Sequence, residues 1–205
     1  VNMNLRELST EEFTDIYNQY LTVDFPQNEV KPLARILDTM KTGLCCAYGL
    51  FDGDVLKGYA VFILPKGLEY GLLDYLAVIR EYRGTGVGHI FFDLIGDTLV
   101  RKSSSLKGLF IESENIEFAT NDAERTIREK RISFYRQNHC ELTSLGARLF
   151  GVTYSIMVYR FDRELSDAQS DRLPTIADLD KIYVAMFKKH HYESRVALWK
   201  EEACE

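Results

Sequence analysis

The stretch YRGTGVGH, residues 82–89, contains three glycines and one arginine within eight positions. It separates an apolar run at residues 72–78, which is typical of a strand, from a run at residues 90–100 that is typical of a helix. A helix that begins near Gly86 exposes free backbone N–H groups and the positive end of its dipole. The glycines remove the β-carbons that would keep an anion away from this backbone. The turn therefore predicts a site for a phosphate-bearing ligand.

Three interpretations of this turn can be compared. A Walker A loop ends in Gly-Lys-Ser/Thr, whereas Gly88 is followed by His89 and Ile90, which excludes it. A dinucleotide fingerprint reads G-x-G-x-x-G and directly follows a strand, whereas the spacing here is G-x-G-x-G after a longer loop. Glu112 could serve as the ribose-binding acid of such a fold, so an oxidoreductase that uses a nicotinamide cofactor stays open as an alternative. The third interpretation is a glycine-rich turn that binds no ligand.

Composition indicates a soluble globular protein. The chain has 205 residues, of which 46% are hydrophobic and 27% are charged, with a net charge of −6. This acidic balance argues against nucleic acid or an anionic membrane as a partner, and no apolar run approaches the ~20 residues that span a bilayer. We expect a cytoplasmic protein, because we find neither a signal-peptide pattern nor a CxxC spacing. We expect no metal site and no disulfide from the four cysteines, Cys45, Cys46, Cys140 and Cys204.

Hydrophobic periodicity, capping residues and turn residues predict the order of elements. We expect strands at 3–8, 45–51, 55–64, 71–78, 108–113, 140–144 and 154–161, and helices from Ser9 to about 20 and at 32–41, 86–101 and 121–138. This order implies an α+β or mixed α/β domain with a partly antiparallel sheet. We place that domain at 1–163. A C-terminal extension at 164–205 contains a polar connector, residues 167–174, and a helix that Thr175 opens, which packs either on the domain or on the partner subunit of a homodimer.

Residues 83–88, R-G-T-G-V-G, match the pattern R/Q-x-x-G-x-G/A, which is the acetyl-CoA pyrophosphate motif of the GNAT superfamily of N-acetyltransferases. The sequence LLDYLAV at 72–78 resembles the central strand of that family. LFIESENIE at 109–117 resembles its next strand, and KRISFYRQN at 130–138 resembles its following helix. The resemblance covers residues 3–161. It implies a central mixed, mostly antiparallel sheet flanked by helices, and acetyl-CoA as the co-substrate.

The resemblance also assigns roles to particular residues. Tyr135 matches the general acid of the family, whose hydroxyl protonates or hydrogen-bonds the leaving sulfur. From the residues alone, Tyr135 could instead be a core tyrosine, because it shares a helical stripe with Ile132. The contacts with acetyl-CoA fall on the end of the central strand and on the glycine turn: Leu76, Ala77, Val78, Arg83, Gly84, Thr85, Gly86, Val87, Gly88 and His89.

A proton acceptor is needed as well, because a lysine-like amine, with a reference pKa of ~10.4, is protonated at neutral pH. Glu112 is our first candidate and Asp74 the second, although either acid could instead position the substrate. The basic stretch from Arg125 to Arg131 is expected to be a solvated helix face with ion pairs such as Glu124–Arg128. The function predicted is transfer of an acetyl group from acetyl-CoA to a primary amine of a small molecule or peptide, with a cationic amine favoured. A non-catalytic module that binds CoA or a protein is a further alternative.

Overall fold

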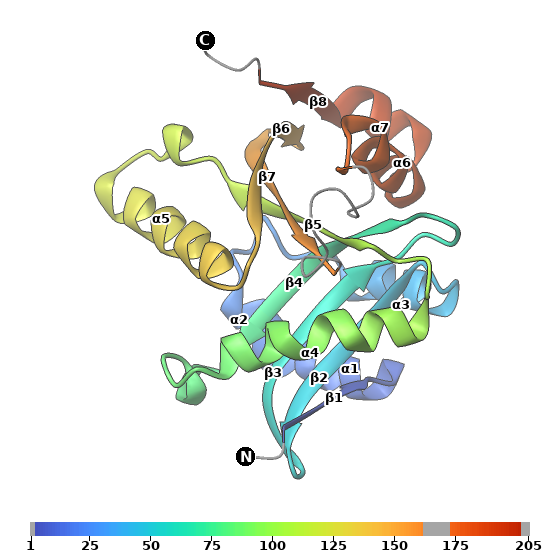
Figure 1. Cartoon of the computed structure of the whole chain (residues 1–205), viewed down its shortest axis with the longest axis vertical. Helices are drawn as coiled ribbons and strands as arrows, with labels where there is room; N and C mark the ends of the chain where they lie inside the picture. Colours follow the sequence, from blue (N-terminus) through green and yellow to red (C-terminus); the bar gives the residue numbers. More distant parts are fainter. Residues whose placement is uncertain (1–2, 162–172, 202–205) are drawn as a thin grey trace. The chain divides into compact units, whose positions relative to one another are not determined.

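A computed structural model of the chain describes residues 3–161 and 173–201 (Figure 1). Its eight strands follow the order β1-β2-β3-β4-β5-β7-β6-β8 in one sheet. The strands are β1 (Met3–Glu7), β2 (Cys45–Asp52), β3 (Val55–Ile63), β4 (Tyr70–Val78), β5 (Gly108–Glu114), β6 (Glu141–Leu149), β7 (Val152–Arg160) and β8 (Val196–Lys200). Neighbouring strands in the pairs β1–β2, β2–β3, β5–β7, β7–β6 and β6–β8 are antiparallel. The expected α+β class with a mostly antiparallel sheet is thus confirmed.

The chain divides into two compact units: Val1–Gly67 with Leu73–Ser104, and Leu68–Leu72 with Ser105–Glu205. The helices of the first unit are α1 (Thr10–Ile16), the π-helical turn η1 (Tyr17–Leu21), α2 (Thr22–Asp24), α3 (Leu33–Lys41), the 3₁₀ turn η2 (Arg80–Tyr82) and α4 (Val87–Lys102). In this unit α4 contacts β1 and β3, while α3 contacts β2 and α1 (Figure 1).

Two local features of the first unit explain its helices. The expected capping box at the start of α1 is confirmed, because the Glu12 N–H donates to Ser9 Oγ at 3.2 Å and the Ser9 N–H donates to Glu12 Oε2 at 2.9 Å. Helix α4 has an apolar face that includes Phe91 and Phe92. Each of these two residues is at most 1% exposed. Burial of each of these rings is worth roughly 1.5–3 kcal/mol, which fixes α4 and therefore the glycine turn at its start.

The second unit contains the 3₁₀ turn η3 (Ile116–Phe118), α5 (Asp122–Gln137), α6 (Ile176–Met186) and α7 (Lys189–Arg195). Helix α5 contacts β5 and β6, and α6 contacts α7 and β8. The C-terminal extension holds more than the expected helix, because α7 and β8 follow α6 and β8 pairs with β6. Gly146 of β6 lies opposite Trp199, and a β-carbon built at Gly146 would lie 2.2 Å from the indole. Glycine at this position therefore lets the tryptophan pack against β6.

Some features expected from the sequence involve residues that the structure does not describe. The domain boundary at 163/164, most of the connector at 167–174, and Cys204 lie outside the described residues. The thiols of Cys45, Cys46 and Cys140 are buried and not in disulfides. Burial raises the pKa of Cys45 and of Cys46 to about 12, so both are protonated at neutral pH.

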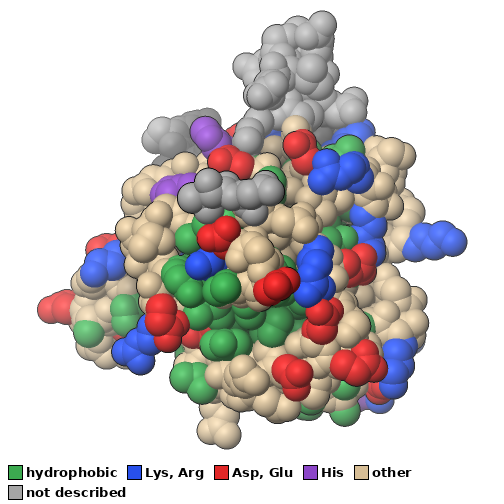
Figure 2. Space-filling model, turned by 90° about the horizontal axis from the view of Figure 1, so that it is seen from below, with side chains coloured by type: hydrophobic (Ala, Val, Ile, Leu, Met, Phe, Trp, Pro, Cys, Tyr) green, Lys and Arg blue, Asp and Glu red, His purple; other side chains and the backbone are tan. Residues whose placement is uncertain are grey.

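Within 3–161 and 173–201, no helix has both the length and the apolar character needed to cross a membrane. Nor do these ranges contain a group of three or more His, Cys, Asp or Glu side chains that could hold a metal ion. On the face drawn in Figure 2, acidic and basic side chains are interspersed, with no large region of one charge.

Candidate functional site

The glycine turn lies between β4 and α4 in the first unit. Gly84 has φ +77° and Gly86 has φ +86°, which is the left-handed region that glycine adopts without steric cost. Both residues are exposed, and no described atom lies within 4 Å of a β-carbon built at either position. The space beside the backbone is therefore open on the side where these β-carbons would stand.

The amide groups of this turn are the second feature of the site. Among the described residues, the N–H groups of 84–88 donate to no protein oxygen. The hydrogen bonds of α4 begin at His89, whose N–H donates to the carbonyl of Gly86 at 3.0 Å, and no side chain caps the helix. A run of free amides at the positive end of a 16-residue helix is a binding site for an anion.

Arg83 holds the turn in place rather than extending as an unpaired charge. Its Nε donates to the carbonyl of Val78 at 2.9 Å, and its Nη2 lies 2.5 Å from Asp24 Oδ1. Asp24 also accepts a hydrogen bond from the Tyr59 hydroxyl at 2.9 Å. Arg83 therefore connects the glycine turn to the end of β4 and to α2. Its guanidinium group is still half exposed on the surface of the turn.

The end of β4 carries the other residues expected to contact acetyl-CoA. Asp74, Leu76 and Val78 alternate on one face at half-buried positions, whereas Tyr75 and Ala77 between them are buried. The Arg83–Val78 hydrogen bond brings the end of the strand and the glycine turn together within the first unit.

Asp74 itself has a cationic partner that the sequence did not indicate. Lys31 Nζ lies 2.5 Å from Asp74 Oδ1, and only 8% of the Asp74 side chain is exposed. The backbone of Lys31 is fixed on both sides, because its N–H donates to the Tyr75 hydroxyl and its carbonyl accepts from the Tyr17 hydroxyl, each at 2.9 Å. A cationic substrate would have to share Asp74 with this ammonium group.

Glu112 and Glu114 share one face of β5 in the second unit, at half-buried positions. Glu112 Oε1 accepts a hydrogen bond of 2.6 Å from the hydroxyl of Tyr183, a residue of α6. Tyr183 lies in the C-terminal extension, outside the segment that resembles a known family. No pattern in the sequence pointed to it as part of a site.

Tyr135 lies in the last turns of α5 at a half-buried position. Burial raises the pKa of Tyr135 to about 12, with an opposing effect from the charge of Arg131 and a small further rise from Cys140. The hydroxyl is therefore protonated throughout the neutral range and able to donate a proton or a hydrogen bond. Ile132, one turn earlier, is buried, so Tyr135 also contributes to packing.

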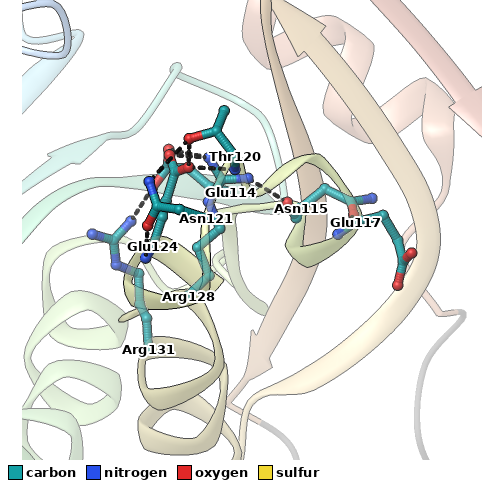
Figure 3. Close-up of polar contacts among 8 residues, drawn as sticks. All are labelled: Glu114, Asn115, Glu117, Thr120, Asn121, Glu124, Arg128 and Arg131. Carbon is teal, nitrogen blue, oxygen red and sulfur yellow. Dashed lines mark hydrogen bonds and ion pairs between the residues drawn. The ribbon is translucent and has the colours of Figure 1, made fainter. Parts of the chain in front are cut away.

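A cluster of charged and polar residues joins α5 to β5 (Figure 3). The Nη1 of Arg128 donates to the carbonyl of Asn115 at 2.5 Å, and its Nη2 lies 2.8 Å from Glu124 and 3.2 Å from Glu114. Arg131 Nη1 donates to the other oxygen of Glu114 at 3.1 Å. The expected Glu124–Arg128 pair is thus confirmed. The expectation of a solvated helix face is wrong for Arg128, which is 6% exposed. Three acceptors surround its two Nη atoms, while its buried Nε has no hydrogen-bond partner among the described residues.

Comparisons with known proteins give similarity in structure only. No protein-family model and no curated protein matches the chain. A spermidine N-acetyltransferase from Vibrio cholerae, solved in complex with CoA and spermine, matches with a TM-score of 0.58 and 11% identity over 80% of this chain and 98% of that chain.

Two further solved structures match over similar lengths. The ribosomal-protein-S18-alanine N-acetyltransferase from Escherichia coli has a TM-score of 0.54 and 15% identity, over 83% of this chain and 99% of that chain. A Bacteroides thetaiotaomicron protein assigned to the GNAT family has a TM-score of 0.56 and 19% identity, over 82% of this chain and 90% of that chain. At these identities the likeness shows a shared fold.

Proposed function

The chain has the fold of the GNAT acetyltransferases, and we propose that it transfers an acetyl group from acetyl-CoA to a primary amine. The observation that carries this proposal is the start of α4, where five consecutive amides, those of residues 84–88, have no protein acceptor among the described residues. These amides and the open space at Gly84 and Gly86 fit a pyrophosphate group. A β-carbon at either glycine would occupy that space.

In this proposal, the glycine turn and the end of β4 bind acetyl-CoA. Acetyl-CoA supplies the acetyl thioester. The amides of 84–88 hold its pyrophosphate, with Thr85 Oγ1 closing the turn through a 2.6 Å hydrogen bond to the carbonyl of Tyr82. The half-buried positions of β4, Leu76 and Val78, hold the chain that carries the thioester. Arg83 acts by fixing the turn and adds its exposed guanidinium charge to the phosphate site.

Proton transfer is assigned to Glu112 and Tyr135. Glu112 accepts a proton from the substrate ammonium, directly or through water, so that the free amine attacks the thioester carbonyl. Tyr135 donates a proton or a hydrogen bond to the departing sulfur, for which its protonated state is suited. We assign Asp74 a positioning role, because Lys31 already occupies one of its oxygens.

The substrate class follows from the charge of the chain and from one structural relative. The net charge of −6 favours attraction of a cationic amine. The Vibrio cholerae relative was solved with spermine, which is consistent with small polyamines as first substrates to assay. Peptides with a free lysine side chain present the same primary ammonium group and belong in the same panel.

The nicotinamide alternative has no support from the fold. A dinucleotide-binding fold of that type needs a doubly wound parallel sheet with the glycine turn at its switch point. The five strand pairs with a described register are all antiparallel. The remaining alternative, a non-catalytic CoA-binding module, differs from an enzyme only in turnover.

Ligand binding followed by turnover tests the proposal. The melting temperature is measured with acetyl-CoA and, separately, with NADH, and release of free CoA thiol is then followed with spermidine, other primary amines and lysine peptides. We expect acetyl-CoA to raise the melting temperature and at least one amine to release CoA. Stabilisation by NADH alone would overturn the proposal. Binding of acetyl-CoA without thiol release across the panel would identify the non-catalytic module instead.

A further inference from the structure

The hydroxyl of Tyr183 hydrogen-bonds the carboxylate of Glu112, which we assign as the proton acceptor. Tyr183 is 0% exposed, and its hydroxyl donates to Glu112 Oε1 at 2.6 Å. A bond of this length between a hydroxyl and a carboxylate is a strong, charge-assisted hydrogen bond. It links residues that are 71 positions apart in the sequence, from α6 and from the middle of β5.

Packing alone does not account for this hydroxyl. The buried face of α6 already has apolar anchors in Leu179 and Ile182, each 0% exposed. The ring of Tyr183 packs against Phe187, with centroids 6.0 Å apart. A phenylalanine at position 183 would keep these ring contacts, so the hydroxyl contributes its polar contacts, among them the one with Glu112.

We propose that Tyr183 is a positioning residue that holds Glu112 in the orientation in which it accepts the proton, which makes the C-terminal extension part of the active site. This inference rests on the proposed acetyl transfer. The hydroxyl is neutral, so it orients the carboxylate and stabilises its ionised form without placing a positive charge against it. Loss of the hydroxyl leaves the carboxylate less firmly oriented and easier to protonate at low pH.

The described charged group nearest to Glu112 along β5 has partners of its own. Glu114, on the same face, is held by Arg128 and Arg131 from α5. Ile156, which is opposite Glu112 in the β5–β7 register, is apolar. A shift of the acidic limb of the pH profile in a Tyr183 variant therefore reports on Glu112.

The test compares Tyr183→Phe with the parent protein in steady-state acetyl transfer to the best amine of the panel, from pH 5.5 to 9. Loss of a hydrogen bond to a charged group should lower kcat/KM about tenfold or more near neutral pH, and should move the acidic limb upward by about one pH unit. Tyr192→Phe is the matched control, because Tyr192 also lies in the extension and its hydroxyl donates to a different carboxylate, that of Asp180. Its profile should match that of the parent.

A double variant separates positioning from general stability. If Tyr183 acts through Glu112, then Tyr183→Phe in a Glu112→Gln background should change the rate by less than twofold. Melting temperatures measured on all variants show whether each is folded. An unchanged pH profile in Tyr183→Phe, or full additivity in the double variant, would overturn this inference alone. Absence of acetyl transfer by the parent would overturn it together with the proposed function.

Discussion

Substitution of Gly86 by valine tests the phosphate site, with Gly67 as the matched control. Both glycines have left-handed backbones, with φ +86° and φ +83°, and neither has a described atom within 4 Å of a built β-carbon. A side chain with a β-carbon costs about 1–2 kcal/mol in this conformation. For a protein of this length each kcal/mol lowers the melting temperature by roughly 2–4 °C. Both variants should therefore melt about 2–8 °C below the parent without ligand.

Only one of the two variants should lose the response to ligand. Acetyl-CoA at 100 times its Kd stabilises the folded state by about 2.7 kcal/mol, which corresponds to a rise of roughly 5–10 °C. Gly67→Val should show this full rise from its lower starting point. If the valine at 86 weakens binding about 100-fold, the same ligand concentration adds only about 0.4 kcal/mol, or roughly 1 °C.

The assay is thermal unfolding of the parent and both variants with a series of acetyl-CoA concentrations, followed by calorimetric titration of the two variants. The titration gives Kd directly and separates weak binding from a low melting temperature. The reasoning is wrong if Gly86→Val binds acetyl-CoA with the affinity of Gly67→Val. In that case the free amides at the start of α4 do not hold the pyrophosphate.

Three further substitutions test other parts of the argument. Tyr135→Phe should lower kcat by ~10²–10⁴-fold while acetyl-CoA affinity barely changes, as measured by kinetics and titration calorimetry. Because the pKa of Tyr135 is about 12, the parent should lose no activity from ionisation of this residue below about pH 11. Full activity of the variant would remove Tyr135 from the mechanism. Arg128→Met should lower the free energy of unfolding in urea by about 1–3 kcal/mol because it leaves partly buried acceptors without their cation, whereas Lys130→Met on the exposed side of α5 should change it by at most about 0.5 kcal/mol. Gly146→Ala should displace Trp199 and speed hydrogen exchange of the β8 amides, and unchanged exchange would show that β8 does not depend on this contact.

Features with a local signal were predictable from the sequence. The capping box of Ser9 and Glu12 needs only residues three apart, and the hairpin of β2 and β3 needs only its turn. The glycine turn belongs to the same class, because left-handed backbone and free helix-start amides follow from the glycines and from the helix behind them.

Contacts between distant segments were not predictable, since no periodicity encodes them. Arg83 was expected from the motif to contact acetyl-CoA, but its ion-pair partner Asp24 lies 59 positions away in the sequence. Arg128 looked like a surface residue on a helix rich in charges. It is buried because the carbonyl of Asn115 and the carboxylate of Glu114 both meet its guanidinium group. A single sequence without an alignment does not pair such residues.

The last strand shows a further limit. β8 has only five residues, and its exposure pattern has no fully buried position, so it has neither the length nor the apolar alternation of a recognisable strand. Its position depends instead on its partner β6, where Gly146 leaves space for Trp199. A lone glycine inside a strand is a sign of close approach by another group, but it does not identify that group.

For the candidate acids Glu112 and Asp74, and for their neighbour Glu114, the contacts made by each carboxylate bear more on its role than its position on the strand does. Lys31 occupies an oxygen of Asp74, and Arg128 and Arg131 occupy both oxygens of Glu114. An ammonium substrate would have to displace these cations to reach either acid. At Glu112, one of the contacts comes from the hydroxyl of Tyr183, which carries no charge. Lys31 and Tyr183 lie outside the motifs that carry the resemblance. If the proposed acetyl transfer holds, we therefore expect contacts from outside the glycine turn to select the acid that accepts the proton.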